Sequence, residues 1–502
     1  MDYLAVRIVI LLWLVRPQDW LSGFGGFQFM QYAMLAAMAG VWLRPQGLQL
    51  GMLRRSPMDW LVIFYLCWIV YTTGDYIGTG RALVPYAAFY FCTALALNTI
   101  KRLSGFITCW TVGLAIAAIF ALSTDWGFEL APGSAALTSS LNGRLALNTW
   151  IFNNPNGLGH GMAALIPLAY ICFIWKRPFG LQVLGFIMIF LAANTVFLTQ
   201  SKGAYLSGAA AITITFLFRK PKILQISFLV VALTVGVAAI KLLPRMETLS
   251  TQEEGIAGRL MIWQMAYNAM TNTVVGEGWK GFEAWIDSKE YGLFKKATHG
   301  SYVNVGADLG YAGLFLFVGI MYACGRALYQ TKLDPEESTE AVRCQRALIA
   351  LLTSFASSAW IIDRAYHSDY FLLAGAIAAF HRLMTMTAEE QAEAEQESNA
   401  RPIDQPEPGT VAALPWMSGM VTQTAGQLAL SKLSPVVHAP MHLAHPVASF
   451  GQNFSEEEEE QEGSKLPLRW LRLDLIDLAM MTGAFFAVIF LWERLMTDFI
   501  SL

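Results

Sequence analysis

Long apolar runs separated by short polar segments extend over most of the chain. Because a helix needs about 20 apolar residues to cross a bilayer, each such run predicts a membrane-spanning helix. The predicted spans lie at residues 3–15, 24–43, 58–73, 82–100, 103–122, 157–175, 179–199, 204–218, 223–243, 303–325, 346–362, 368–383 and 475–492. We expect the first to be a span rather than a cleaved signal, because Arg7 interrupts it and no small-residue cleavage site follows. The pattern predicts an all-α polytopic integral membrane protein with about 12–13 transmembrane helices.

Basic residues cluster in alternate loops between these spans. Cytoplasmic loops carry an excess of lysine and arginine, so these loops and the N-terminus are expected in the cytoplasm. The clusters are Arg54-Arg55, Lys101-Arg102, Lys176-Arg177, Arg219-Lys220-Pro221-Lys222, and Arg343 with Arg346. The opposite loops, 123–156, 200–203, 244–302 and 363–367, are then expected to face outward. This arrangement predicts a multi-pass protein of the inner (cytoplasmic) membrane, with a large helical loop at 244–302 that faces the periplasm or cell exterior.

Three regions of different composition follow from the same pattern. Residues 1–383 form the predicted membrane core, and residues 473–502 an additional C-terminal transmembrane anchor. Between them, 384–472 is acidic and contains scattered prolines, so it cannot bury enough apolar surface to fold and is predicted to be a disordered cytoplasmic linker. The linker contains His438, His442 and His445. Such loosely spaced histidines in a polar tail are more often incidental than a metal-binding tract.

The overall composition excludes several classes of protein. Hydrophobic residues make up 55% of the chain and charged residues 14%, against roughly 25% charged residues in soluble domains. This excludes a soluble enzyme and a disordered protein, and the net charge of −3 gives no basic footprint for nucleic acid. None of the six cysteines forms a Cys-x-x-Cys pair, so neither a disulfide framework nor a zinc site is predicted.

The long external loop contains a segment with helical periodicity. Leu260, Trp263, Ala266, Tyr267 and Met270 recur at helical spacing after Gly258-Arg259. In a helix that starts there, Arg259 lies in the first turn, where a cation opposes the helix dipole. An anion shared between Arg259 and the N–H groups of that turn would explain the arrangement. Neutralisation by Glu253 or Glu254 would explain it equally, and the local sequence leaves both open.

A glycine-rich segment follows in the same loop. Gly276-Glu277-Gly278-Trp279-Lys280-Gly281 matches the dinucleotide-binding pattern by letter. No strand precedes it and no βαβ unit surrounds it, so we reject a nucleotide site. The segment is predicted to be a turn that joins two loop helices.

Two further residues could carry chemistry at the outer face. His299-Gly300-Ser301-Tyr302 ends the loop, just before the glycines at 306, 310 and 313 of the next span. An imidazole there could accept a proton from an attacking hydroxyl, although a lone histidine is more often structural. Lys202, in Ser201-Lys202-Gly203, lies at the outer end of a span, where it could face a diphosphate or simply extend to the interface.

These elements, in this order and on this side of the membrane, resemble the O-antigen ligase and polymerase superfamily of bacterial membrane glycosyltransferases. The matches are Ser201-Lys202-Gly203, Gly258-Arg259 with Trp263, Gly276-Glu277-Gly278, and His299 with Tyr302, Gly310 and Gly313; Asn153-Asn154-Pro155-Asn156 is also similar. The resemblance covers roughly residues 60–382. Where the family usually has arginine this chain has Lys202, which binds phosphate without the bidentate fork.

The resemblance implies a GT-C-like fold and transfer of a glycan from an undecaprenyl-diphosphate carrier to an acceptor hydroxyl on lipid A-core or protein. Arg259 and Lys202 would stabilise the leaving diphosphate, and His299 would be the base. Ser201, Tyr302 and Arg144 are possible substrate contacts. The implied enzyme needs neither a metal nor another cofactor. A polysaccharide polymerase of the same superfamily remains an alternative, as does a transporter for an ion or small solute, although few charged residues lie within the spans.

The remaining polar and aromatic residues of the outer loops have two explanations each. Asp363, Arg364, His367 and Asp369 crowd one short turn, where they could be functional or could cap helix ends through an Asp363–Arg364 pair. The tryptophans at 126, 150, 279 and 285 are typical of interfacial aromatics, and less often of a platform for sugars.

Overall fold

The structure is a computed structural model that describes residues 2–20, 28–43, 56–128, 135–138, 143–228, 230, 254–288, 298–333, 338–400 and 473–500. Met1–Glu390 and Leu466–Leu502 form one compact unit, and Gln391–Lys465 form a second, of which only the helical residues 391–400 are described. The elements are α1 (Asp2–Val15), α2 (Pro17–Trp20), α3 (Phe29–Trp42), α4 (Pro57–Thr73), α5 (Tyr76–Ala96), α6 (Ile100–Asp125), β1 (Ala135–Thr138), β2 (Arg144–Leu147), α7 (Pro155–Ala169), the short π-helix η3 (Tyr170–Ile174), α8 (Phe179–Thr199), α9 (Lys202–Leu217), α11 (Glu254–Asn272), α12 (Gly281–Ser288), α13 (Ser301–Gln330), α14 (Thr339–Ser358), α15 (Ser368–Ala400) and α16 (Leu475–Ile500).

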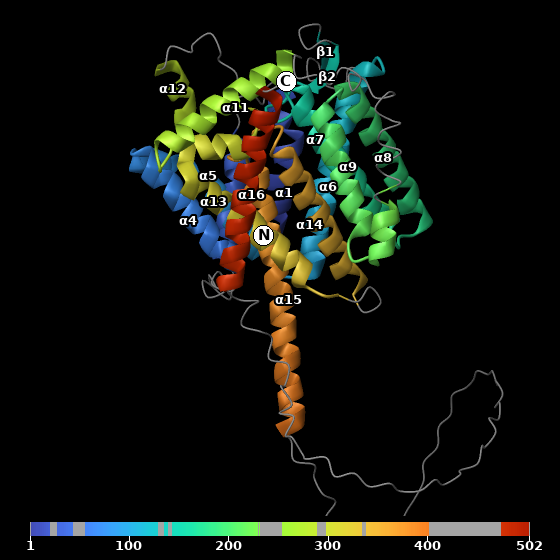
Figure 1. Ribbon diagram of the computed structural model, residues 1–502. Coiled ribbons are helices and arrows are strands. Elements are labelled where there is room, and N and C mark those ends of the chain that lie inside the picture. The colour runs from blue at the N-terminus through green and yellow to red at the C-terminus, as the bar shows by residue number, and fades with distance from the viewer. Residues whose placement is uncertain are drawn as a thin grey trace, which may run out of the picture. The chain divides into compact units, whose positions relative to one another are not determined.

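The fold is an all-α polytopic membrane protein, as the hydrophobic pattern predicts (Figure 1). Among the described residues, five helices are long and apolar enough to cross a membrane: Ile100–Ser123, Pro155–Ile174, Phe179–Thr199, Ser301–Gln330 and Leu475–Thr497. The helices Phe29–Trp42 and Pro57–Thr73 are apolar but shorter. The total of 12–13 spans therefore stays a prediction, and most of the span predicted at 223–243 lies outside the described residues.

Several boundaries differ from those predicted. The outer loop 123–156 contains an antiparallel pair of short strands, in which β1 pairs with β2 in the register Ala135↔Leu147 to Thr138↔Arg144. The loop helix α11 begins at Glu254 rather than at Gly258, so Arg259 lies beyond its first turn and the argument from the helix dipole does not apply to it. Helix α14 ends at Ser358 rather than 362, and α15 continues past 383 to Ala400. The Ala- and Glu-rich sequence of that extension has high helix propensity.

Two helices form the centre of the packing. Helix α7 contacts α6, α8, α9 and α14, while α13 contacts α4, α11, α14 and α16. Helix α14 joins these two groups, because it packs on both α7 and α13. Helices α7 and α13 are thereby held in one bundle, and the loop helix α11 lies directly on α13 (Figure 1).

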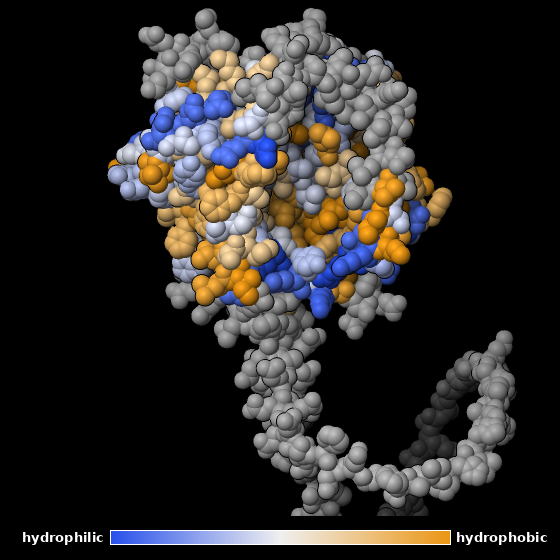
Figure 2. All heavy atoms as spheres, viewed as in Figure 1, coloured by the Kyte–Doolittle hydropathy of each residue, from blue (hydrophilic) through white to orange (hydrophobic). Residues whose placement is uncertain are grey.

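The outer surface of the bundle is apolar in the manner of a lipid-facing protein. Phe179, Phe186 and Phe190 of α8 are all exposed, although the helix is among the most hydrophobic of the chain. Figure 2 shows one face of the molecule, where apolar residues occupy the middle and hydrophilic residues gather toward the upper and lower margins. Because lipid does not penalise exposed apolar side chains, this distribution fits a protein embedded in a bilayer.

Ionisable side chains buried among the helices are paired with one another. Arg382 of α15 lies 3.8 Å from Asp59 of α4, which also accepts a hydrogen bond of 2.7 Å from Tyr90. Arg326 of α13 lies 2.7 Å from Asp477 of α16. A buried charge is expensive unless it is paired, so these contacts hold helices together.

Helix α13 is kinked at Gly310, whose φ of 66° and ψ of −164° are accessible mainly to glycine. A kink releases backbone carbonyl groups from the helix, and each needs another donor. The amide groups of Glu277 and Gly278 donate to the carbonyls of Ala307 and Asp308 at 3.1 and 2.7 Å. The Trp68 indole donates to the Leu309 carbonyl at 2.9 Å.

The glycine-rich segment therefore has a structural role against this kink. It joins α11 to α12 as predicted, and a Cβ atom at Gly276 would lie 2.5 Å from the Asp308 carbonyl oxygen. Only glycine permits such a close approach. The segment consequently fixes the position of α12 above the outer half of α13.

Helix α16 belongs to the same compact unit as the core. Its Trp492 is fully buried, and a Cβ atom at Gly306 of α13 would lie 2.9 Å from the Trp492 ring. Tyr267 of α11 donates a hydrogen bond to Glu493, and its ring contacts that of Trp492 at 5.5 Å. The last helix thus supports the loop helix that carries Arg259.

Candidate functional site

The first part of the site lies where α7 and α9 begin. Asn154 caps α7 by accepting a hydrogen bond of 2.7 Å from the amide of Gly157, and Pro155 starts the helix. The carboxamide oxygen of Asn156 accepts hydrogen bonds from Ser201 at 2.9 Å and from Arg144 at 2.8 Å. Three segments far apart in the sequence are thereby joined just before Lys202.

Lys202 is the first residue of α9 and is half-buried. Ser201 caps this helix, since its hydroxyl oxygen accepts a hydrogen bond of 3.3 Å from the amide of Ala204. Arg144 also donates to the Thr199 carbonyl at 2.8 Å, so its guanidinium holds the turn between α8 and α9. Contact of Ser201 or Arg144 with a substrate stays a prediction.

A buried histidine, His160, lies next to Gly203, the residue that follows Lys202. His160 of α7 is 1% exposed, and its Nδ1 lies 2.7 Å from the hydroxyl of Ser207 on α9. Its Nε2 has no hydrogen-bond partner and would lie 2.9 Å from a Cβ atom at Gly203. Both Arg259 and Arg364 are close enough to act electrostatically on His160. The structure therefore brings Arg259 toward the beginning of α9, although 57 positions separate it from Lys202.

His299 is tied to the same loop helix as Arg259. The Trp263 indole, one helical turn after Arg259, donates a hydrogen bond of 2.8 Å to the Thr298 carbonyl. His299 follows with a φ of 48°, a left-handed conformation that few residues other than glycine adopt. Strained backbone of this kind is concentrated at functional sites.

The turn between α14 and α15 completes the surroundings of His299. The amide of Ser301 donates to the Ala359 carbonyl at 2.6 Å, and its hydroxyl accepts a hydrogen bond of 2.8 Å from the amide of Arg364. Arg364 pairs with Asp369 at 3.2 Å rather than with Asp363. Asp369 lies in the first turn of α15, where a carboxylate is favourable for the helix dipole.

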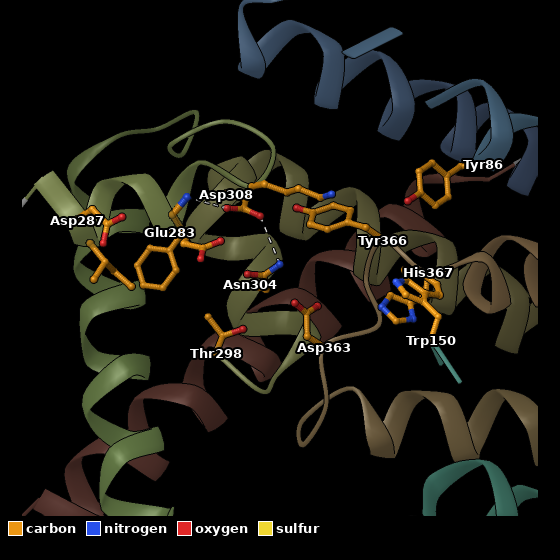
Figure 3. Close-up of a pocket in the computed structure, with 13 residues that line it drawn as sticks. Tyr86, Trp150, Glu283, Asp287, Thr298, Asn304, Asp308, Asp363, Tyr366 and His367 are labelled. Carbon is orange, nitrogen blue, oxygen red and sulfur yellow. Dashed lines mark hydrogen bonds between the residues drawn. The ribbon is translucent and has the colours of Figure 1, made fainter. Parts of the chain in front are cut away.

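A cavity of about 420 Å³ opens on the other side of this turn. Its walls come from α5, α12, α13, the residues just before α12 and α13, the segment between β2 and α7, and the α14–α15 turn (Figure 3). The lining residues are Tyr86, Trp150, Lys280, Phe282, Glu283, Ile286, Asp287, Thr298, Asn304, Asp308, Asp363, Tyr366 and His367. This volume is within the range of small-molecule binding sites.

The floor of the cavity is held by specific contacts. Asp308 is buried, accepts a hydrogen bond of 3.0 Å from the amide of Phe282 and lies 3.4 Å from the Asn304 carboxamide nitrogen. The hydroxyl of Tyr366 points toward Asp308 (Figure 3). Burial raises the pKa of Asp363 to about 6, although the Ala365 amide and Lys280 act in the opposite direction. Burial also lowers the pKa of His367, with Asp369 opposing that shift, which favours the neutral imidazole.

The remaining candidates have structural contacts. Tyr302 is buried, and its hydroxyl donates to the Ala356 carbonyl at 3.0 Å. Trp150 stacks on His367 with ring centroids 5.4 Å apart and also lies 5.4 Å from the Arg16 guanidinium. Its ring therefore contacts protein groups and is one wall of the cavity. Substrate contact by Tyr302 stays a prediction.

Sequence reasoning missed His160 and the cavity residues Asn304 and Asp308. His160 lies within an apolar run of the sequence. Its position beside α9, the helix that begins at Lys202, becomes visible only in the structure, through its contact with Ser207. The available signal for Asp308 was a carboxylate within a glycine-rich span. Within the described ranges, no group of three or more His, Cys, Asp or Glu side chains could hold a metal ion. The histidines at 438, 442 and 445 lie outside the described residues.

Comparison with known proteins identifies one family. Residues 186–318 match the family described as O-antigen ligase. A search of curated proteins found none that matches the chain. The matching segment contains Lys202, Arg259 and His299, and it extends from α8 through the outer loop into α13. The resemblance noted in the sequence is thus confirmed over residues 186–318, which are similar to the O-antigen ligase family.

Proposed function

We propose that the protein transfers a glycan from an undecaprenyl-diphosphate carrier to an acceptor hydroxyl at the outer face of the inner membrane. The match of residues 186–318 to the O-antigen ligase family supports a glycosyltransferase-like enzyme. The single observation that carries the proposal is the position of Arg259. Its helix places it within electrostatic range of His160 beside the start of α9, while Trp263 of the same helix holds the backbone next to His299.

The proposed reaction is a displacement at the anomeric carbon of the donor glycan. The acceptor oxygen forms a bond to that carbon, and the bond between the carbon and the diphosphate oxygen breaks with its electron pair. The acceptor proton passes to His299. Negative charge grows on the departing lipid diphosphate, and Arg259 and Lys202 stabilise it. The activated donor supplies the driving force, so the proposed reaction needs neither a metal nor a nucleotide.

The orientation of the chain is part of this proposal. Basic clusters such as Lys176-Arg177 and Arg219-Lys220 lie at the opposite ends of α8 and α9 from Lys202, which supports an outward-facing site. In a variant whose exposed Cys67 is replaced by serine, a cysteine at the exposed position Val274 should react with a membrane-impermeant thiol reagent in spheroplasts. A cysteine at the exposed position Ile223 should react only after the membrane is permeabilised. The reverse result would contradict the orientation.

Transfer by the purified protein tests the reaction itself. The protein is incubated with an undecaprenyl-diphosphate-linked glycan and separately with lipid A-core, an acceptor protein, or a second molecule of the lipid-linked glycan. Glycan appearing on one of the first two acceptors supports a ligase, and a longer glycan on the lipid carrier supports the polymerase alternative of the same superfamily. No release of lipid diphosphate with any acceptor would contradict both.

A further inference from the structure

The cavity beside the α14–α15 turn contains polar atoms that the protein leaves without partners. Thr298 is 4% exposed, and its hydroxyl has no hydrogen-bond partner in the structure. The Oδ1 atom of Asp363 is buried and also has none. Both residues line the cavity, and Figure 3 shows both side chains directed into it. Because a buried polar group without a partner is unfavourable, these atoms indicate a polar occupant.

The chemistry of the lining selects the kind of occupant. A hydroxyl such as that of Thr298 can both donate and accept a hydrogen bond, and Asn304 offers a carboxamide with the same two capacities. The carboxylate of Asp363 accepts only, so the occupant must supply donors. A sugar, whose hydroxyl groups donate and accept, meets all of these requirements. A phosphate dianion has no donor to offer.

The charge of the cavity lining also favours a neutral occupant over an anionic one. Among the described residues that line the cavity, Lys280 is the one lysine, and four carry carboxyl groups: Glu283, Asp287, Asp308 and Asp363. Glu283 and Asp287 lie one turn apart on α12, and both are exposed at the rim. A phosphate group that comes near these two carboxylates is repelled, because like charges repel.

The cavity also adjoins the reacting groups along the chain. Thr298 precedes His299, and Asp363 precedes Arg364, which acts electrostatically on His160. A sugar held by Thr298 and Asp363 is therefore held by the chain neighbours of His299, the proposed base, and of Arg364. We propose, building on the proposed transfer reaction, that this cavity binds an uncharged, hydroxyl-rich sugar of the acceptor and excludes acceptors that carry a phosphate monoester there.

Binding without any donor tests this proposal independently of transfer. Saturation-transfer NMR on the purified full chain would use a panel of neutral disaccharides, built from hexoses, N-acetylhexosamines and deoxyhexoses, and the same disaccharides carrying one phosphate monoester. At least one neutral disaccharide should bind, and its phosphorylated form should bind at least about tenfold more weakly.

Three variants locate the binding. Thr298→Val preserves the shape of a side chain whose hydroxyl has no protein partner, so the protein should fold, and neutral binding should weaken by roughly 2- to 10-fold. The double variant Glu283→Gln with Asp287→Asn should bring the phosphorylated form close to the neutral one. Thr271→Val is the matched control, because that exposed hydroxyl contacts only carbonyls of its own helix.

Three outcomes would overturn the proposal: no disaccharide of the panel binds, the phosphorylated forms bind as well as the neutral ones, or Thr298→Val binds like the control. Loss of the transfer reaction is a separate result. If the wild-type protein binds neutral disaccharides in this cavity but transfers no glycan, the proposed function fails while the site remains.

Discussion

The end of the bundle that carries the α14–α15 turn contains two regions of opposite character on the two sides of that turn. On one side, Arg259, Arg364 and Lys202 lie near the buried His160 and the start of α9. On the other side, Asp308 and Asp363 form part of a cavity that α12 borders with further carboxylates. The first region suits an anion, and the second suits a group that donates hydrogen bonds.

The difference matches the two substrates that a glycan transfer must distinguish. In the proposed reaction, the donor carries its charge on the diphosphate that leaves, while the acceptor contributes only a hydroxyl at the reacting position. A site with cations throughout would attract diphosphate to the acceptor position as well. Separation of charge across the turn at 359–367 would orient donor and acceptor before any chemistry occurs.

The largest effect is expected at the boundary between the two regions. His299→Ala should reduce the transfer rate by about 10²- to 10⁴-fold. A positioned base that removes the hydroxyl proton typically accelerates such a reaction by that factor. Binding of the lipid-linked donor, measured on the same purified protein, should be retained. If donor binding falls together with transfer, His299 is a phosphate ligand or a structural residue rather than the base.

The basic region should show the next largest effect. Arg259→Ala should reduce transfer by roughly 30- to 1000-fold, which corresponds to about 2–4 kcal/mol of lost stabilisation of the leaving group. Lys202→Arg is the matched variant and should retain most activity, because it restores the arginine typical of the family. Wild-type rates in a well-expressed Arg259→Ala protein would remove Arg259 from the mechanism.

A smaller effect is expected from the support of the basic region. Tyr267→Phe and Glu493→Gln each weaken the hydrogen bond that joins α11 to α16, and each should lower the transfer rate by roughly 2- to 10-fold. Thr497→Val, which alters a hydroxyl bonded only within α16, is the control. An effect confined to protein yield, with the rate per folded molecule unchanged, would show that α16 does not position Arg259.

The acidic region should show the smallest effect, on stability. Burial raises the pKa of Asp363 from 3.8 to about 6, so the folded protein holds this proton more tightly than the unfolded chain. Stability therefore falls as pH rises from about 4 to 6, and the loss is complete above that range. Asp363→Asn removes the free-energy cost of burying an ionised carboxylate at this position. It should therefore raise the Tm in detergent by a few °C at pH 7.5, with roughly no gain at pH 4. An equal gain at both pH values would contradict the shift.

The regular parts of this fold could be predicted from local sequence, while the site could not. Apolar runs indicate α6, α8 and α13, because burial in lipid depends on composition along one segment. The turn at Gly276 and the helix around Trp263 were likewise predictable from spacing. The cavity brings Tyr86, Thr298 and Asp363 together, and the pattern around each gives no sign of the others. The hairpin of β1 and β2 was missed although Asn142-Gly143 is a turn signal, because each strand has only four residues and shows little alternation.

The contact between Tyr267 and Glu493 also sets an order of events during synthesis. The two residues are 226 positions apart, and a ribosome adds roughly 5–20 residues per second. Helix α11 therefore exists for about 10–45 s before its partner has been made. Throughout that interval the nascent chain carries Arg259 on a helix that lacks its contact with α16. The arrangement of the basic region is completed only when the final helix has been inserted.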